Sequence, residues 1–243
     1  MTRFKVETDR RSLLGLTAAG IAAALAPSGL GASEPAHAPA KPGLSPAQSL
    51  AKLVEGNRRF VADQLPGTDI STRRRLEIAK GQAPFAALVG CADSRVGPEH
   101  LFGAGLGELF IVRTAGNYVD DAGFGSLAYA VAMLGVPLIV VLGHERCGAV
   151  DAAVKLVTAN AQLPPSLTRM VRPILPAVID ARAAHPGGDL LHHAIHTNVR
   201  HVVRGLRQSS DPLLAAPLLS GKLKIVGAHY DLDTGAVEFV DLA

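Results

Sequence analysis

Residues 137–147 read Pro-Leu-Ile-Val-Val-Leu-Gly-His-Glu-Arg-Cys, a run of apolar side chains that leads directly into a histidine and a cysteine. A continuous apolar run of this length, ending at Gly143, indicates a strand that is buried on both faces. Residues 85–95, Phe-Ala-Ala-Leu-Val-Gly-Cys-Ala-Asp-Ser-Arg, repeat the arrangement. Two buried strands that each end in reactive side chains therefore decide the fold and point to the place of a functional site.

The rest of the chain alternates between the same two kinds of element. Further strands are predicted at 109–112 and 223–227, and residues 237–240 follow a turn as an antiparallel edge strand. Helices are predicted between the strands and near the end of the chain, at 44–62, 72–79, 125–134, 149–158, 167–184 and 190–206. The pattern predicts one α/β domain over 41–243, with a mainly parallel central sheet of four strands plus an antiparallel edge strand, flanked by helices.

The first forty residues have the composition of an export signal. Arg10 and Arg11 precede the apolar segment Leu13–Ala26, which is too short to span a bilayer and resembles the core of a twin-arginine signal peptide. Cleavage is expected after Ala40 or Ala32, and the mature protein is expected in a bacterial periplasm. An ordinary amphipathic helix at the N-terminus is the alternative.

Composition limits the classes of function. Of the 243 residues 48% are hydrophobic and 19% are charged, which is typical of a chain that buries a core. The formal charge of +3 and the absence of tryptophan argue against a nucleic-acid surface. We expect no nucleic-acid partner, and no membrane association once the signal is removed.

The two strand ends predict a zinc site. Ligands gather outside the carboxyl ends of parallel strands, so Cys91, His144 and Cys147 are expected in one crevice. Two thiolates and an imidazole are a known ligand set for catalytic Zn²⁺, with the fourth position left for water. A disulfide between the two cysteines is the default in an exported protein. Export of an already folded protein would instead keep both thiolates on the metal.

Asp93 and Arg95 follow the first cysteine at alternate positions, so the side chains of all three can share one face of the extended strand end. An arginine beside a carboxylate keeps it ionised and oriented. Asp93 could then accept a hydrogen bond from hydroxide at the metal. The alternative is an ion pair with no catalytic role.

These motifs resemble those of the β-class carbonic anhydrases. The likeness rests on residues 91–96 (C-A-D-S-R-V), 107–117 (G-E-L-F-I-V-R-T-A-G-N), 143–148 (G-H-E-R-C-G) and 227–235 (G-A-H-Y-D-L-D-T-G). It implies one Zn²⁺ per subunit on the three predicted ligands. It also implies that Asp93 and Arg95 form a catalytic dyad, in which Asp93 can move onto zinc in a closed, inactive form.

The resemblance further implies a small substrate pocket and a homodimer or higher homo-oligomer. Gln82 matches a glutamine that donates a hydrogen bond to substrate, and Gly148 belongs to the substrate-binding positions. Phe110 and Tyr129 match residues that line an apolar pocket, contributed in part by a second subunit. From the sequence pattern alone, both aromatic residues would be assigned to the core.

The chain departs from one pattern in that family. Leu88 stands where a subset has a tryptophan of a second bicarbonate site. We therefore expect no cooperative inhibition by bicarbonate, and we expect Arg113 to be a structural ion-pair partner.

The predicted reaction is the reversible hydration of carbon dioxide to bicarbonate and a proton by zinc-bound hydroxide. Alternatives are hydrolysis of carbon disulfide or carbonyl sulfide on the same fold, and a catalytically silent zinc-binding module. His192, His193 and His196 have helical spacing suited to a second metal. We favour a scaffold role for them, because no carboxylate or cysteine accompanies them at ligand spacing.

Overall fold

The computed structural model describes residues 43–65 and 67–241, which hold the predicted α/β domain apart from residue 66 and its two ends. The predicted signal peptide and its cleavage points lie outside the described residues. No helix in the described part of the chain combines the length and the apolar character needed to cross a membrane.

Five strands form one sheet in the spatial order β2-β1-β3-β4-β5. The strands are β1 (Ala86–Cys91), β2 (Leu109–Thr114), β3 (Leu138–His144), β4 (Lys224–Tyr230) and β5 (Val237–Asp241). The first four are parallel to their neighbours, and β5 pairs antiparallel with β4. This confirms the predicted sheet of four parallel strands with an antiparallel edge strand.

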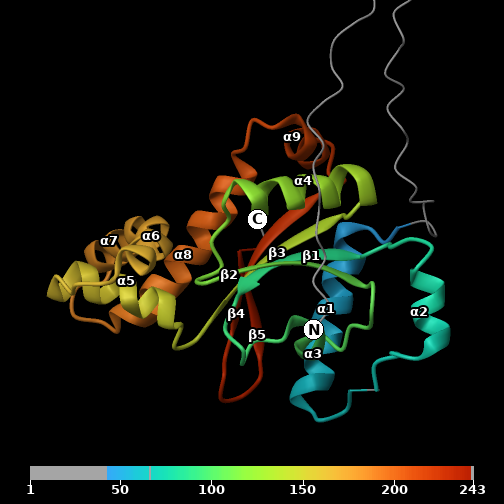
Figure 1. Cartoon of the computed structure of the whole chain (residues 1–243), viewed down its shortest axis with the longest axis horizontal. Coiled ribbons are helices and arrows are strands. Elements are labelled where there is room, and N and C mark those ends of the chain that lie inside the picture. The colour runs from blue at the N-terminus through green and yellow to red at the C-terminus, as the bar shows by residue number, and fades with distance from the viewer. Residues whose placement is uncertain (1–42, 66, 242–243) are drawn as a thin grey trace, which may run out of the picture. The chain divides into compact units, whose positions relative to one another are not determined.

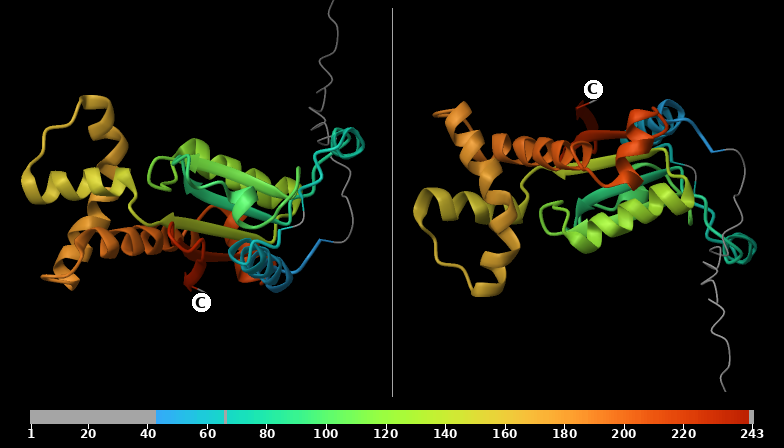
Figure 2. Two further views of the ribbon diagram at one scale, coloured as in Figure 1. Left: turned by 90° about the horizontal axis from the view of Figure 1, so that it is seen from below. Right: turned by 90° about the horizontal axis from the view of Figure 1, so that it is seen from above.

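Helices cover both faces of this sheet (Figure 1). The described helices are α1 (Pro46–Val61), α2 (Thr72–Ile78), α3 (Pro98–Leu101), α4 (Asp121–Leu134), α5 (Gly148–Ala159), α6 (Pro165–Val171), the 3₁₀ turn η1 (Arg172–Ile174), α7 (Leu175–Ala184), α8 (Leu190–Arg207) and α9 (Pro212–Leu219). Side chains of α4, α8 and α9 pack with one face of the strands, and those of α1 and α3 pack with the other. The views in Figure 2 show α1 and α4 on opposite sides of the sheet.

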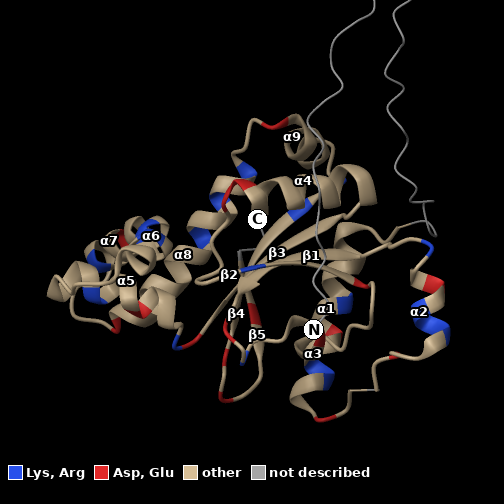
Figure 3. Ribbon diagram, in the orientation of Figure 1, with Lys and Arg blue, Asp and Glu red and all other residues tan. Residues whose placement is uncertain are grey.

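The layers follow from the burial of the strands. Every residue of β1 and β3 is buried, so alternate side chains of each strand enter the two opposite apolar layers. Figure 3 shows basic and acidic residues interspersed along the elements.

The prediction of one continuous helix at 167–184 is wrong. The structure divides this segment into α6, η1 and α7, with Pro173 inside η1 and Pro176 in the first turn of α7. Proline has no N–H and clashes with the preceding turn, so two prolines three residues apart interrupt the helix. The short helices α3 and α9 are absent from the predicted set, and Asp120 begins α4 earlier than predicted by accepting a hydrogen bond from the Gly123 N–H.

Helices α5, α6 and α7 lie beside the end of the sheet where the site is expected. In Figures 1 and 2, α5, α6 and α7 gather at one end of the domain, next to the carboxyl end of β3, and α2 lies at the opposite end. The sheet therefore has two distinct ends, one closed by α5–α7 and one facing α2.

Candidate metal centre

Three potential ligands meet at the carboxyl ends of the parallel strands. Cys91 is the last residue of β1, His144 is the last residue of β3, and Cys147 immediately precedes α5. All three are buried, and one ligand atom from each lies within 4.8 Å of the others. The two sulfur atoms are 3.9 Å apart and both cysteines are free, so they do not form the disulfide that was the alternative.

A tight turn brings His144 and Cys147 together. Arg146 in this turn has a φ of 50°, a left-handed conformation that is unfavourable for a residue with a side chain. Two hydrogen bonds of 2.8 Å from the Arg146 guanidinium to Asp233 stabilise the turn, and the Glu145 N–H donates to the Tyr230 carbonyl. The turn is thus anchored to the end of β4 and the loop that follows.

The imidazole of His144 is oriented to receive a metal. Its Nδ1 lies 2.8 Å from the carbonyl oxygen of Glu145, which accepts a hydrogen bond from the ring when Nδ1 carries the proton. Nε2 is buried and has no hydrogen-bond partner among the described residues. A buried nitrogen lone pair without a partner is unfavourable unless an ion uses it. The side chains present therefore fit a Zn²⁺ ion.

The two thiols influence each other strongly. The hydrogen bond from Cys147 lowers the pKa of Cys91, and His144 and the Gly116 N–H lower it further, against the effect of burial. The same sulfur pair raises the pKa of Cys147, as does burial. One proton therefore leaves readily and the second is held between the sulfur atoms, until a cation makes the loss of both favourable.

Asp93 and Arg95 lie beside this group as a bidentate ion pair. Arg95 donates from Nε to Oδ1 at 2.9 Å and from Nη2 to Oδ2 at 2.7 Å. This guanidinium holds the pKa of the Asp93 carboxyl well below its usual range. Asp93 Oδ2 is 3.9 Å from His144 Nε2, so an ionised, oriented carboxylate adjoins the metal position.

Arg113 has a structural role, although its partners differ from those predicted. Its Nε donates to the carbonyl oxygen of Cys91 at 2.8 Å and its Nη2 donates to that of Asp93 at 2.7 Å. The predicted ion pair is therefore wrong: the described partners are backbone carbonyls. Arg113 fixes the main chain where β1 leaves the sheet.

The predicted pocket residues do not all lie at this end of the sheet. Gln82 lies three residues before Phe85. The Phe85 N–H donates to the backbone carbonyl of Glu108, which extends the β1–β2 pairing toward the amino ends of the strands. Phe110 pairs in register with Ala87, four positions from Cys91, or about 13 Å at the rise of a strand. The Tyr129 ring lies 6.4 Å from that of Phe110. Gln82, Phe110 and Tyr129 thus lie toward the amino end of the strands.

Gly148, in contrast, adjoins the metal ligands. It is the first residue of α5, and a Cβ added there would meet nothing within 4 Å. The exposed glycine leaves open space next to Cys147.

Gly116 and Asn198 support the centre but are not among the predicted site residues. The Gly116 N–H donates to Cys91 Sγ at 3.3 Å, and Asn198 Nδ2 donates to the Gly116 carbonyl at 2.9 Å. Gly116 has a φ of +79°, and a Cβ there would lie 2.5 Å from Ile174. The T-A-G-N motif was a local signal for this turn, whereas Asn198 is 82 residues away in sequence.

The histidines of α8 form a separate cluster with a buried histidine of β4. The His196 ring stacks on that of His229 at 4.2 Å between centroids, and the His192 ring lies 4.5 Å from that of His196. Burial lowers the pKa of His196 and of His229 to about 4. His229 carries no predicted role, yet it is 7% exposed and joins this cluster.

Comparison with known proteins agrees with this geometry. The family model described as carbonic anhydrase matches residues 86–237. Carbonic anhydrase 2 of Mycobacterium tuberculosis is 40% identical over 197 residues, covering 80% of this chain and 92% of that protein. The carbonic anhydrase of Mycolicibacterium smegmatis is 38% identical over 198 residues, covering 81% and 94%. The solved β-carbonic anhydrase of Coccomyxa, in complex with acetazolamide, is 27% identical with a TM-score of 0.62, covering 79% and 86%.

Proposed function

Because this chain belongs to the β-class carbonic anhydrase family, we propose that it catalyses the reversible hydration of carbon dioxide to bicarbonate and a proton, with Zn²⁺ as its cofactor. One observation carries the proposal. Cys91, His144 and Cys147 converge within 4.8 Å, and the ionised Asp93–Arg95 pair adjoins them.

Cys91, His144 and Cys147 would hold the ion, which when bound supplies a Lewis acid that makes water nucleophilic near neutral pH. Asp93, kept ionised by Arg95, accepts a hydrogen bond from the attacking oxygen and orients its lone pair. The open space beside Gly148 admits the small linear substrate. Because two thiolates neutralise much of the charge of the ion, it would acidify water less than an ion held by three histidines. We therefore expect activity to rise through roughly pH 7 to 8.

We also propose that the working protein is a homodimer or a higher homo-oligomer. Gln82, Phe110 and Tyr129 lie toward the other end of the strands from Cys91, so a pocket that uses them needs a second subunit. The strand β2 is an edge of the sheet and offers a surface for that contact.

A second feature supports association. Helix α2 has no buried residue, and Leu76 in it is 64% exposed. Ile70, just before the helix, is 63% exposed. Apolar side chains exposed together are typical of a surface that is covered in an assembly. The mass of the protein in solution, measured by light scattering, tests this: a monomer would contradict it.

Export through a twin-arginine route to the periplasm is proposed from Arg10, Arg11 and the apolar segment that follows. Cell fractionation of the wild-type chain and of an Arg10→Lys, Arg11→Lys variant tests the proposal. We expect the variant to remain in the cytoplasm. Equal distribution of both proteins would contradict it.

Stopped-flow measurement of carbon dioxide hydration tests the proposed reaction. Protein of measured zinc content is compared with Cys147→Ser, which lacks one ligand, and with Ser94→Ala, an exposed residue outside the ligand set. We expect turnover in the wild type and in Ser94→Ala, and loss of both zinc and turnover in Cys147→Ser. No turnover by fully metallated wild-type protein would contradict the proposal. Carbon disulfide and carbonyl sulfide would then be the substrates to assay.

A further inference from the structure

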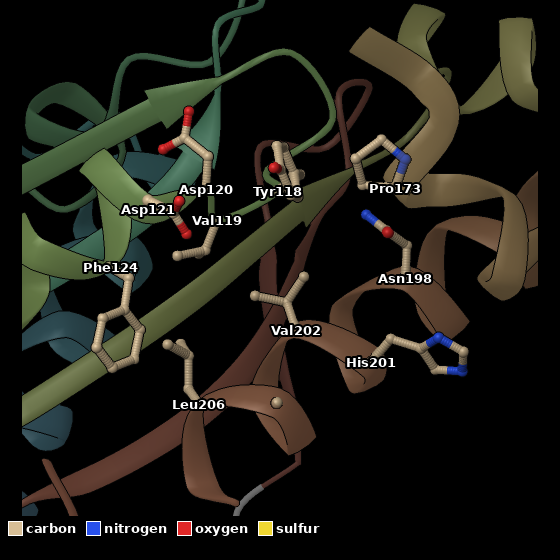
Figure 4. Close-up of a pocket in the computed structure, with 11 residues that line it drawn as sticks. Tyr118, Val119, Asp120, Asp121, Phe124, Pro173, Asn198, His201, Val202 and Leu206 are labelled. Carbon is tan, nitrogen blue, oxygen red and sulfur yellow. The ribbon is translucent and has the colours of Figure 1, made fainter. Parts of the chain in front are cut away.

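A hollow of about 370 Å³ lies between the start of α4 and the second half of α8. Its walls include the apolar side chains Val119, Phe124, Val202 and Leu206. In Figure 4, Asp120 and Asp121 lie on one side of it, and Asn198 and His201 lie on the other, with Val202 between them. This volume falls within the range of small-molecule sites, and its lining joins apolar walls to a few polar groups.

Gly205 leaves space in the hollow, because it lies inside helix α8 and has no side chain. It lines the hollow from the interior of α8, where glycine lowers helix stability relative to alanine. Packing does not require it, because a Cβ at this position would meet nothing within 4 Å. Gly143 is the contrasting case, since a Cβ there would lie 2.6 Å from the side chain of Val199. At Gly205 a side chain would take up space in the hollow.

The charge of the lining indicates the class of ligand. Asp120 and Asp121 contribute two exposed carboxyl groups, and no lysine or arginine lines the hollow. Neither carboxyl group forms a salt bridge with a lysine or arginine in the part of the chain that the structure describes. One oxygen of Asp120 accepts the Gly123 N–H, and the His201 ring faces Asp180 at 3.0 Å. A cation attached to an apolar body matches these walls.

The hollow also shares a wall with the metal centre. Asn198 lines it and donates to the Gly116 carbonyl, and the Gly116 N–H donates to Cys91 Sγ. A ligand against Asn198 would therefore lie two hydrogen bonds from a zinc ligand, on the far side of the 114–118 turn.

We propose that this hollow is a second binding site, which takes a small organic cation: a primary ammonium group on an aromatic or aliphatic body. The apolar part packs against Phe124, Val202 and Leu206, and the ammonium group faces Asp120 and Asp121. The site is distinct from the zinc centre, and its occupation does not depend on the proposed hydration reaction.

Isothermal titration of the full zinc-loaded protein with 3-phenylpropylamine tests the proposal, with 3-phenylpropanol and 3-phenylpropionate as neutral and anionic probes of the same carbon skeleton. We expect the amine to bind most tightly and the carboxylate least. The matched variant is Gly205→Leu, which adds a side chain to the lining at a position where a Cβ meets nothing within 4 Å, and it should leave carbon dioxide hydration unchanged. It should weaken amine binding about tenfold or more. Asp121→Asn, which removes one carboxylate without touching the Asp120 cap, should weaken it about threefold.

Three results would overturn the proposal. Equal affinity for the amine and the alcohol would remove the role of the carboxylates. Unchanged amine binding in Gly205→Leu would place the ligand elsewhere. A change in oligomeric state caused by Gly205→Leu would show that a second copy of the chain fills the hollow. If Gly205→Leu does not fold, Gly205→Ala and Asp121→Asn provide the same comparison with smaller substitutions.

Discussion

The two ends of the parallel sheet differ in how much of the proposed site a single chain completes. At the carboxyl end, Cys91, His144 and Cys147 meet within 4.8 Å and are buried. Toward the amino end, Gln82 and Phe110 precede or begin their strands and lie far from those ligands. A single chain thus brings the three potential metal ligands together at the carboxyl end (the finished end), whereas in the proposed assembly the residues at the amino end (the unfinished end) would serve a neighbouring subunit.

The largest effect is expected at the finished end. Asp93→Asn removes the anionic acceptor beside the metal position and leaves the three ligands in place. We expect turnover of carbon dioxide to fall about 10²-fold or more, with zinc content unchanged. Asp151→Asn is the matched control, because its exposed carboxylate pairs with Lys155 on α5. Near wild-type turnover in Asp93→Asn would remove the proposed role of Asp93.

A smaller effect is expected at the unfinished end. Gln82→Leu would remove the proposed hydrogen bond to substrate, so we expect kcat/KM to fall about tenfold while zinc content and assembly stay the same. Gln162→Leu changes an exposed glutamine in a loop and serves as the control. If both variants behave alike, Gln82 has no part in the reaction.

A still smaller effect is expected for Arg113, which holds the main chain next to the metal ligands at the finished end. Arg113→Gln removes the fork that donates to the Cys91 and Asp93 carbonyls, and turnover should fall about threefold to tenfold. Arg113→Lys should recover part of that loss, because lysine keeps the charge but reaches only one carbonyl well. Equal turnover in wild type and both variants would mean that the hydrogen bonds of Arg113 do not position Asp93 and Arg95.

The smallest effect concerns stability rather than catalysis. His196 and His229 have pKa values lowered to about 4, chiefly by burial and then by neighbouring charges, with His192 in both cases and Arg200 beside His196. Both rings stay neutral in the folded protein, whereas in the unfolded chain they bind protons below about pH 6.5. Stability should therefore decline as the pH falls from about 6.5 toward 4.

Urea unfolding at pH 7 and pH 5 measures this decline. His229→Leu removes one of the two groups and keeps an apolar side chain, so its midpoint should change less between the two pH values than that of wild type. Both proteins are measured without metal, so that loss of metal in acid does not enter the comparison. An equal change in both would show that His229 does not contribute.

The sequence predicted the fold well wherever apolar runs are continuous. The runs at 85–90 and 137–143 become β1 and β3, since few other structures bury six or seven consecutive side chains. Short helices were harder. Asp211 and Pro212 form a recognisable start for α9, but Pro217 inside the helix obscures it.

The metal centre was predictable because strand ends converge at one edge of a parallel sheet. The separation of Gln82 from Cys91 follows from the strand predicted between them, although the two positions are only nine residues apart in sequence. The link from Asn198 through Gly116 to Cys91 depends on how α8 packs against the 114–118 turn. No local pattern encodes such a contact.

Activity of mixed assemblies tests the division between the two ends most directly. Differently tagged Cys147→Ser and Gln82→Leu subunits are co-expressed, and assemblies that carry both tags are purified and assayed for carbon dioxide hydration. If Gln82 serves the neighbouring subunit, the zinc site of each Gln82→Leu chain receives an intact glutamine, and mixed dimers should show about half of wild-type activity. Activity no higher than the mean of the two parent variants would show that Gln82 serves its own chain and would contradict the account.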